Sequence, residues 1–433
     1  MSNILKLADI VKIKGGKRLP KGENLQITPN AHPYIRVRDM KGKFIPTDEL
    51  EYVPDHIFPK IKNYLVNTND VIVSIVGSIG LVSIITEKLN NASQTENCAK
   101  LSGLDRIDAE YLYYFLISEI GQAELQKATV GAVQPKLPLY GLENVSIDWK
   151  TRTEREEIVK QLNSLDNKIQ LNTQINQTLE QIAQALFKSW FVDFDPVRAK
   201  VQALSDGLSF EQTELAAMQA ISGKTPEELT ALSQTQPDRY AKLVETAKAF
   251  PCEMVEVEGV EVPKGWEVKP IELILDRLKN KQKLRKEEIS FEGTIPVFEQ
   301  GASILMGYHD KDAAFNASID EPIFIFGDHT CITKLSTIPF SIYQNVIPLI
   351  GKNLPTYWVY CAIQNKQTFQ EYRRHWAELI VKEVIVPDNI NLCQYFSKKV
   401  KGLFFKIDIN HQENKTLIDT RDILLPKLLN GDI

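Results

Sequence analysis

The feature that most constrains this chain is a stretch from 151 to 190 in which apolar residues recur alternately every four and three positions. The positions on this face are Ile158, Leu162, Leu165, Ile169, Asn172, Asn176, Leu179, Ala183, Leu186 and Trp190. Such spacing is typical of a helix in a coiled coil. Thr151 and Glu154 have capping-box spacing at its start, and Pro196 lies just past its end. Buried asparagines weaken a coiled coil unless they meet polar partners, so we expect a partner helix with asparagines at matching depth.

The chain contains that partner itself. When it is shifted from 168 to 406, the segment KIQLNTQINQTL matches KIDINHQENKTL, and the central asparagines recur as Asn410 and Asn414. Two unrelated helices would rarely share both the seam and its polar interruption, so we interpret the match as an internal repeat. The asparagines could meet in either a parallel or an antiparallel pair.

Length and composition bound what surrounds these helices. A chain of 433 residues allows about three domains at ~150 residues each. No apolar run approaches the ~18 residues of a membrane span, and the N-terminus lacks a signal pattern. We therefore expect a cytoplasmic protein without a membrane partner. The net charge is −5, so any binding to nucleic acid must come from local basic patches.

The pattern divides the chain into five segments. They are a mixed domain (1–150), a long helix (151–191), a helical acidic connector (192–263), a second mixed domain (264–388) and a second long helix (389–433). PTYWVYCAIQ in the second domain resembles AEYLYYFLIS in the first, so the two domains are interpreted as diverged copies. The predicted fold class is α/β (α+β), with two mixed domains separated by two long helices.

Candidate contacts to DNA in the first domain follow from local charge and from turns. Residues 1–43 contain ten Lys or Arg and three acids, a patch that could face phosphates. Two arginines at i and i+2 of a predicted strand could reach one groove or could equally lie on a solvated face. Polar residues in two predicted turns could contact bases and phosphates, or could order their turns. The candidates are Lys14, Lys17, Arg18, Arg36, Arg38, Ser78, Gln134 and Lys136.

The second domain opens with a basic cluster from 277 to 286 that contains no acidic residue. Phosphate contact is expected there, and polar and aromatic residues in later loops suit base readout. Each of these residues alone could instead be structural. The candidates are Arg277, Lys279, Lys281, Gln300, Tyr308, His309, His329, Arg374 and His375.

The order domain, long helix, domain, long helix carries a resemblance to a known family. Together with DVIVSIVGSIG, YLYYFL, GAVQP, ALFKSWFVDFDP and DILLPKLLNGDI, it resembles a specificity subunit of a type I restriction-modification system over nearly the whole chain. The resemblance implies two target-recognition domains in pseudo-twofold repeat, each reading half of a split DNA sequence, and an antiparallel pair of helices between them. The second domain departs from the pattern, because GHD-like and HWAEL stretches replace its GAVQP-type loop.

The resemblance also implies partners. These are double-stranded DNA, two adenine-N6 methyltransferase subunits and restriction (translocase) subunits. S-adenosylmethionine, and ATP and Mg²⁺ for restriction, would bind those partners and not this chain. Phe187, Trp190 and Phe191 cluster near one helix end and are candidates for methyltransferase docking, with packing under their own domain as the alternative.

Catalytic motifs are missing from the sequence. It has no NPPY-type tetrapeptide, no glycine-rich S-adenosylmethionine loop and no GxxxxGK[ST], and we expect no metal site, so a non-catalytic subunit is predicted. Two alternatives remain open. One is a coiled-coil scaffold that binds proteins and not DNA. The other is a metal-dependent nuclease that uses a PD…ExK string formed by Asp388, Glu413 and Lys415.

Overall fold

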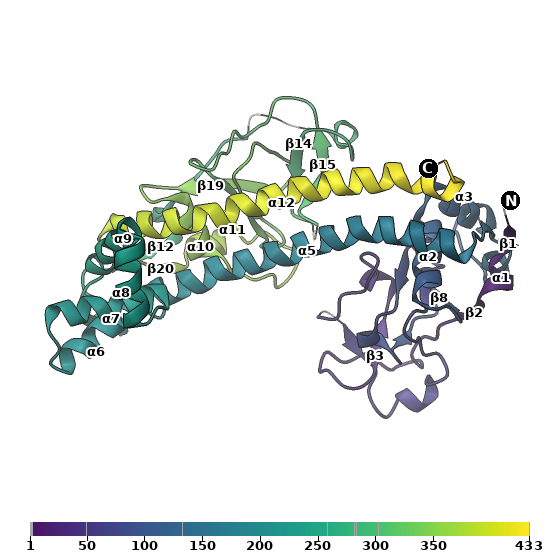
Figure 1. The fold of residues 1–433 in the computed structure, drawn as a ribbon, viewed down its shortest axis with the longest axis horizontal. Coiled ribbons are helices and arrows are strands. Elements are labelled where there is room, and N and C mark those ends of the chain that lie inside the picture. The colour runs from purple at the N-terminus through teal and green to yellow at the C-terminus, as the bar shows by residue number, and fades with distance from the viewer. Residues whose placement is uncertain are drawn as a thin grey trace. The chain divides into compact units, whose positions relative to one another are not determined.

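The computed structural model describes residues 3–48, 50–131, 133–257, 259–280, 282, 284–301 and 303–432. The chain divides into two compact units (Figure 1). The first unit contains residues 1–170 and 414–433, and the second contains residues 171–413. Among the described residues, no helix is both long and apolar enough to cross a bilayer.

The domain in the first unit is built on two small sheets. The larger has the antiparallel order β2 (Lys12–Gly15), β8 (Cys98–Ser102), β5 (Val71–Ser74), β6 (Val82–Ile84), and the smaller has the order β4 (Glu51–Tyr52), β3 (Pro33–Ile35), β7 (Ser93–Gln94). A further pair joins β1 (Ile4–Lys6) to β9 (Ser146–Asp148). The helical elements are α1 (Leu7–Ile10), α2 (Arg106–Ile117), α3 (Glu119–Ala128), α4 (Leu139–Glu143), η1 (Val37–Asp39), η2 (Phe58–Lys60) and η3 (Glu87–Leu89).

The domain in the second unit has the same plan. Its larger sheet has the order β13 (Leu275–Arg277), β19 (Val346–Gly351), β16 (Ile323–Gly327), β17 (Thr333–Ser336), and its smaller sheet has the order β15 (Leu305–His309), β14 (Ile295–Phe298), β18 (Ser341–Ile342). β12 (Glu267–Pro270) pairs with β20 (Glu383–Val386). The helical elements are α10 (Thr356–Ile363), α11 (Trp376–Ile380), η4 (Ile271–Leu273) and η5 (Lys286–Glu288).

The two domains repeat each other strand by strand. In each larger sheet the hairpin β5–β6 or β16–β17 is antiparallel, and in each smaller sheet the pair β3–β7 or β14–β18 is parallel. The first strand of each hairpin, β5 or β16, is largely buried because it consists mainly of apolar residues on both faces. The predicted mixed fold, with one topology used twice, is confirmed.

The two long helices are α5 (Arg152–Phe191) and α12 (Ile390–Asn430) (Figure 1). In the second unit the Nδ2 of Asn410 donates to the Oδ1 of Asn176 at 2.7 Å. In the first unit Arg421 pairs with Asp166 at 3.0 Å. Because later residues of α12 meet earlier residues of α5, the pairing is antiparallel, as the resemblance implied. The asparagines therefore do meet polar partners.

The segment between α5 and the second domain contains four helices and a hairpin. The helices are α6 (Asp195–Ser205), α7 (Phe210–Ser222), α8 (Pro226–Thr235) and α9 (Pro237–Ala249), and the hairpin joins β10 (Met254–Val257) to β11 (Val260–Pro263). The prediction of a helical connector was wrong for the hairpin, whose sequence alternates with a period of two around Gly259. A buried ion pair of 3.0 Å between Lys200 and Glu214 joins α6 to α7.

Candidate nucleic-acid interface

The basic residues at the start of the first domain are exposed on and just after β2. Lys14 and Lys17 point to solvent, and the side chain of Arg18 is 80 % exposed with Glu96 3.5 Å away. Exposed ion pairs of this kind are weak, so Arg18 stays available to a stronger anionic ligand. The three side chains can meet phosphates, and that role stays a prediction.

Arg36 and Arg38 do not lie on one strand face. β3 ends at Ile35, and η1 places both arginines against Glu51, with nitrogen–oxygen distances of 2.6 Å for Arg36 and 2.5 Å for Arg38. The hydrogen bond from Arg36 lowers the pKa of Glu51. The predicted strand was wrong because Asp39 accepts from the backbone N–H of Arg36 at 2.8 Å and turns the chain. The two arginines hold the start of β4 through Glu51 and do not lie side by side on a strand face to reach a groove together.

Ser78, Gln134 and Lys136 lie in two loops that the fold brings together. Lys136 forms a β-bridge with Val76, and the N–H of Leu137 donates to the carbonyl of Ile75 at 2.9 Å. Ser78, Gln134 and Lys136 are all exposed. Two stretches more than fifty residues apart thus form one polar surface, which suits a contact with DNA.

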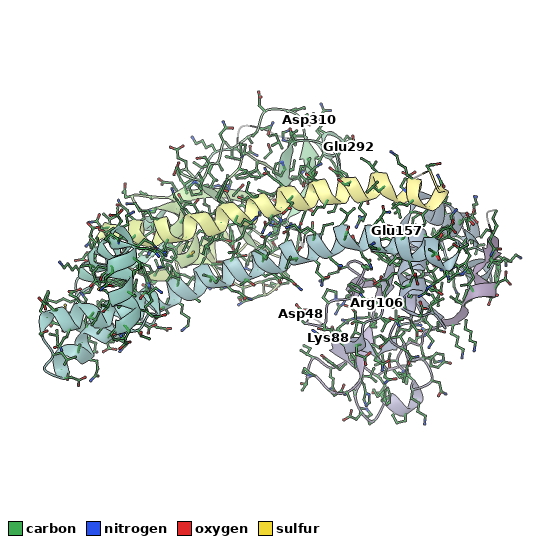
Figure 2. All side chains as sticks on the ribbon, viewed as in Figure 1. Asp48, Lys88, Arg106, Glu157, Glu292 and Asp310 are labelled. Carbon is green, nitrogen blue, oxygen red and sulfur yellow. The ribbon has the colours of Figure 1, made fainter. Side chains whose placement is uncertain are left out.

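In the second domain, Arg277 and Lys279 are exposed on and just after β13. Lys281 lies outside the described residues. The edge formed by β14 and β15 is different, because exposed Glu292 and Asp310 lie on its loops (Figure 2). Carboxylates repel phosphates, which makes that edge less suited to the DNA backbone, although β13 also exposes Asp276 beside Arg277. Tyr308, half-buried on β15 beside Asp310, is a weaker candidate than its aromatic ring suggested.

His309 and His375 are buried, and the prediction that they contact bases was wrong. The Nε2 of His309 lies 2.9 Å from Ser341 Oγ, while its Nδ1 accepts from the N–H of Lys311 at 3.0 Å. Burial lowers the pKa of His309, so the ring is held neutral. His375 is fully buried and bonds to Glu378 and to the carbonyl of Glu371. Both rings are satisfied inside the domain and order its loops.

Gln300, His329 and Arg374 lie nearer the surface. The amide oxygen of Gln300 accepts from the N–H of His329 at 3.0 Å, so Gln300 has a structural role. The His329 ring packs at a tilt against Tyr372, with centroids 4.8 Å apart, and Tyr372 is 74 % exposed. Sequence reasoning missed Tyr372, although it lies two residues before the candidate Arg374.

A concavity beside this loop brings two of the predicted residues together. Its volume is about 410 Å³, and its lining residues are Arg277, Asp328, Asn345, Val346, Ile347, Arg374, Trp376 and Ala377. The Arg374 side chain is 78 % exposed and its Nε lies 3.7 Å from Asp328. Asn345, which sequence reasoning missed, is exposed in a left-handed conformation with φ of 58°. Asparagine is one of the few residues that adopt this conformation readily. This preference for a turn is the only sign in the sequence that could have pointed to Asn345.

The aromatics proposed for subunit docking are buried inside the second unit. Phe187, Trp190 and Phe191 are at most 7 % exposed and pack against Phe396 of α12, with ring centroids 5.5–6.1 Å apart. Docking through these three residues was therefore wrong, and the alternative of packing under their own domain is confirmed. These three aromatic side chains are buried because α12, the antiparallel partner of α5, packs over them.

The nuclease alternative fails on geometry. Asp388 precedes α12, whereas Glu413 lies 23 residues beyond the first residue of that helix. At ~1.5 Å per residue the separation is roughly 35 Å, too far for one metal ion. Within the described ranges, no group of three His, Cys, Asp or Glu residues could hold a metal ion.

Comparisons with known proteins agree on one family. A model described as the type I restriction modification DNA specificity domain matches residues 2–181. The HindI specificity subunit of Haemophilus influenzae is 40% identical over 328 residues, which cover 69% of this chain and 71% of the relative. The MjaIX specificity subunit of Methanocaldococcus jannaschii is 23% identical, with 100% and 93% of the two chains covered.

Among solved structures, the S subunit of a type I restriction-modification system from M. genitalium covers 99% of this chain and 96% of its own, with 17% identity and a TM-score of 0.48. The sequence relatives show the family of this chain. The chain, with its twice-used domain and two long antiparallel-paired helices, belongs to the specificity subunits of type I restriction enzymes, the non-catalytic components that recognise the DNA target.

Proposed function

We propose that this chain reads a split DNA target, with one half-site for each domain. The observation that carries the proposal is the use of one sheet topology twice in one chain. Each copy is followed by a long helix, α5 or α12. Each copy also presents exposed basic side chains from loops, with Lys136 in the first and Arg374 in the second. Loops on a rigid scaffold are the usual place for such contacts.

We propose that two adenine-N6 methyltransferase subunits dock on the long helices, and that restriction subunits join them. S-adenosylmethionine, ATP and Mg²⁺ then bind those partners. With the buried aromatics excluded, exposed Leu171 and Ile182 on α5 and Ile423 on α12 become the candidates for docking. A protein that marks the DNA of its own cell works in the cytoplasm, and we place this chain there.

The length of the helices supports a role in spacing the half-sites. A helix of 40 residues is roughly 60 Å long, and DNA advances ~34 Å per turn. Deleting residues 168–174 and 412–418 together removes seven residues from each of the two antiparallel helices, including Asn172 and Asn414. We expect a changed gap with both half-sites intact, and an unchanged gap would contradict the spacing role.

The test is to co-express the chain with its methyltransferase subunit in a host without adenine methylation and to map N6-methyladenine. A split motif with two defined halves and a fixed gap is the expected result. One short contiguous motif would show that only one domain reads DNA. A stable complex without methylation, combined with no salt-dependent DNA binding, would favour the protein scaffold.

A further inference from the structure

The two domains share a corner of three backbone segments that sequence alignment does not reveal. In the first domain, Ile75 donates its N–H to the carbonyl of Asn97 at 2.8 Å and accepts from the N–H of Leu137 at 2.9 Å. In the second, Asp328 donates to the carbonyl of Asn345 at 3.0 Å and accepts from the N–H of His375 at 2.8 Å. Ile75 and Asp328 each follow the equivalent strand, β5 or β16.

This shared framework puts Lys136 and Arg374 in equivalent places. Each directly precedes the residue whose N–H closes the corner, and each is exposed. The two loops have little sequence in common, since GAVQPKL occupies the first and YRRHW the second. A rigid corner that carries a different cation in each copy fits a position where each domain meets its own DNA sequence.

The corner of the second domain is shaped to present hydrogen-bond donors. Arg277 and Arg374 both line the 410 Å³ concavity, with exposed Asn345 on the same wall. Asp328 is 9 % exposed, and its carboxylate accepts from the N–H of Trp376 at 3.0 Å. Asp328 also lines the concavity, but one of its carboxylate oxygens is committed to the corner and the other lies 3.7 Å from the Nε of Arg374.

We propose that Arg374 reads a guanine in the half-site of the second domain, an inference that rests on the function proposed above. A guanidinium has a planar fork of donors that matches the O6 and N7 acceptors of guanine in the major groove. The only acid near Arg374 among the contacts described for it is Asp328, at 3.7 Å, so the fork is free to rotate toward a base. The exposed Tyr372, packed at a tilt against His329, lies in the same loop.

The same guanidinium could instead contact a phosphate. A base contact and a phosphate contact predict different results when the side chain is removed. Loss of a base contact relaxes the sequence at one position, whereas loss of a phosphate contact weakens binding to every sequence. The experiment compares the complex of full chain and methyltransferase subunit carrying Arg374→Ala with the unaltered complex, by mapping N6-methyladenine. Arg373→Ala is the matched control, because the adjacent Arg373 is paired with Glu371 at 2.9 Å and with Glu378.

We expect a guanine at one position of one half-site in the unaltered complex. Arg374→Ala should reduce discrimination at that position about 10- to 100-fold and leave the other half-site unchanged, and Arg373→Ala should keep the guanine. If Arg374→Ala abolishes methylation, discrimination is measured by binding instead. The affinities of the purified complex for duplexes that carry each of the four bases at that position are then compared. An unchanged motif, whether at full or uniformly lowered methylation, would overturn the proposal. A wild-type complex without a split motif would instead overturn the proposed function.

Discussion

The two domains attach to the long helices through equivalent tyrosines but with different chemistry. Tyr114 on α2 and Tyr360 on α10 both place their hydroxyls on carboxylates of α5. Tyr114 reaches Asp166 at 2.6 Å, and Tyr360 reaches Glu180 at 2.9 Å. Around Tyr114 the surroundings are polar, because Lys43 donates to its hydroxyl at 3.1 Å and Arg421 pairs with Asp166.

The second attachment is mainly apolar. At the repeat shift from 168 to 406, Asp166 corresponds to Phe404 and Arg421 corresponds to Ala183. Phe404 packs edge-on against Tyr360, with centroids 5.5 Å apart, and Ala183 is fully buried in the aromatic core. Duplication thus preserved the backbone plan while each copy acquired its own means of attachment. At the tyrosine, the first attachment depends on charge and hydrogen bonding and the second on aromatic packing, while apolar residues of both long helices are buried in each unit.

The largest expected effect comes from opening a cavity in the aromatic core of the second unit. Trp190 is 1 % exposed and contacts Phe250 and Phe396. Trp190→Ala should lower the free energy of unfolding of the second unit by about 3–5 kcal/mol through lost burial and a cavity. Urea titration followed by hydrogen exchange reports each unit separately. Phe210→Ala, at a residue 64 % exposed, is the control and should stay within about 0.5 kcal/mol; equal losses for the two variants would contradict the account.

A smaller and unequal effect should follow from removing the two hydroxyls. Tyr114→Phe removes the hydroxyl that half-buried Lys43 and Asp166 share, although Lys43 keeps Asn163 and Asp166 keeps Arg421, and we expect a loss of about 1–3 kcal/mol in the first unit. Tyr360→Phe should cost less, about 0.5–1.5 kcal/mol, because Glu180 still accepts from Gln364 at 2.7 Å. The same hydrogen-exchange titration measures both. If Tyr360→Phe proves the costlier substitution, the contrast between polar and apolar attachment is wrong.

Acid should affect the second domain through His309. Burial lowers the pKa of this histidine below its ordinary value of 6.5. As the pH falls below about 6.5, the unfolded chain binds a proton that the folded domain resists, so the stability of the second unit should decline between 6.5 and the lower folded pKa. His309→Gln should reduce this slope without abolishing it, because burial also lowers the pKa of His411 in the same unit to about 4, and it should leave the slope of the first unit as it was. If the stability of the second unit falls with acid equally in the unaltered chain and in His309→Gln, His309 is not a source of the acid dependence.

The smallest effect should come from the corner of the first domain. Lys136 is a flexible ammonium where the second domain has the planar guanidinium of Arg374, so we expect it to contact a phosphate. Lys136→Ala should weaken binding evenly across DNA sequences and reduce the slope of log affinity against log salt by about 1. Fluorescence anisotropy of the purified complex at several salt concentrations measures this. A relaxed base preference would mean instead that Lys136 reads a base.

The sequence predicted the features that depend on local periodicity. The seam spacing located both long helices, and the resemblance of AEYLYYFLIS to PTYWVYCAIQ correctly paired α2 with α10 and hence Tyr114 with Tyr360. The antiparallel direction needed the resemblance as well. The asparagines of α5 would meet those of α12 in a parallel pair as well as in an antiparallel one. Contacts that set this direction involve residues more than two hundred positions apart.

Other features depend on partners that periodicity cannot reveal. His309 is withdrawn from the surface by Ser341, and Arg36 by Glu51, each from a distant part of the chain. The shared corner escaped alignment because the two copies differ in loop length and sequence. Ile75 and Asp328 are equivalent through backbone hydrogen bonds alone, which any side chain can make.

The most direct test of the central claim, that each domain reads its own half-site, is a methylation map of three complexes side by side. These contain the unaltered chain, Lys136→Ala and Arg374→Ala, each with the methyltransferase subunit. The account predicts a split motif in the unaltered complex, relaxation of one half only for Arg374→Ala, and both halves preserved at lower methylation for Lys136→Ala. A contiguous motif, or an Arg374→Ala change in both halves at once, would contradict it.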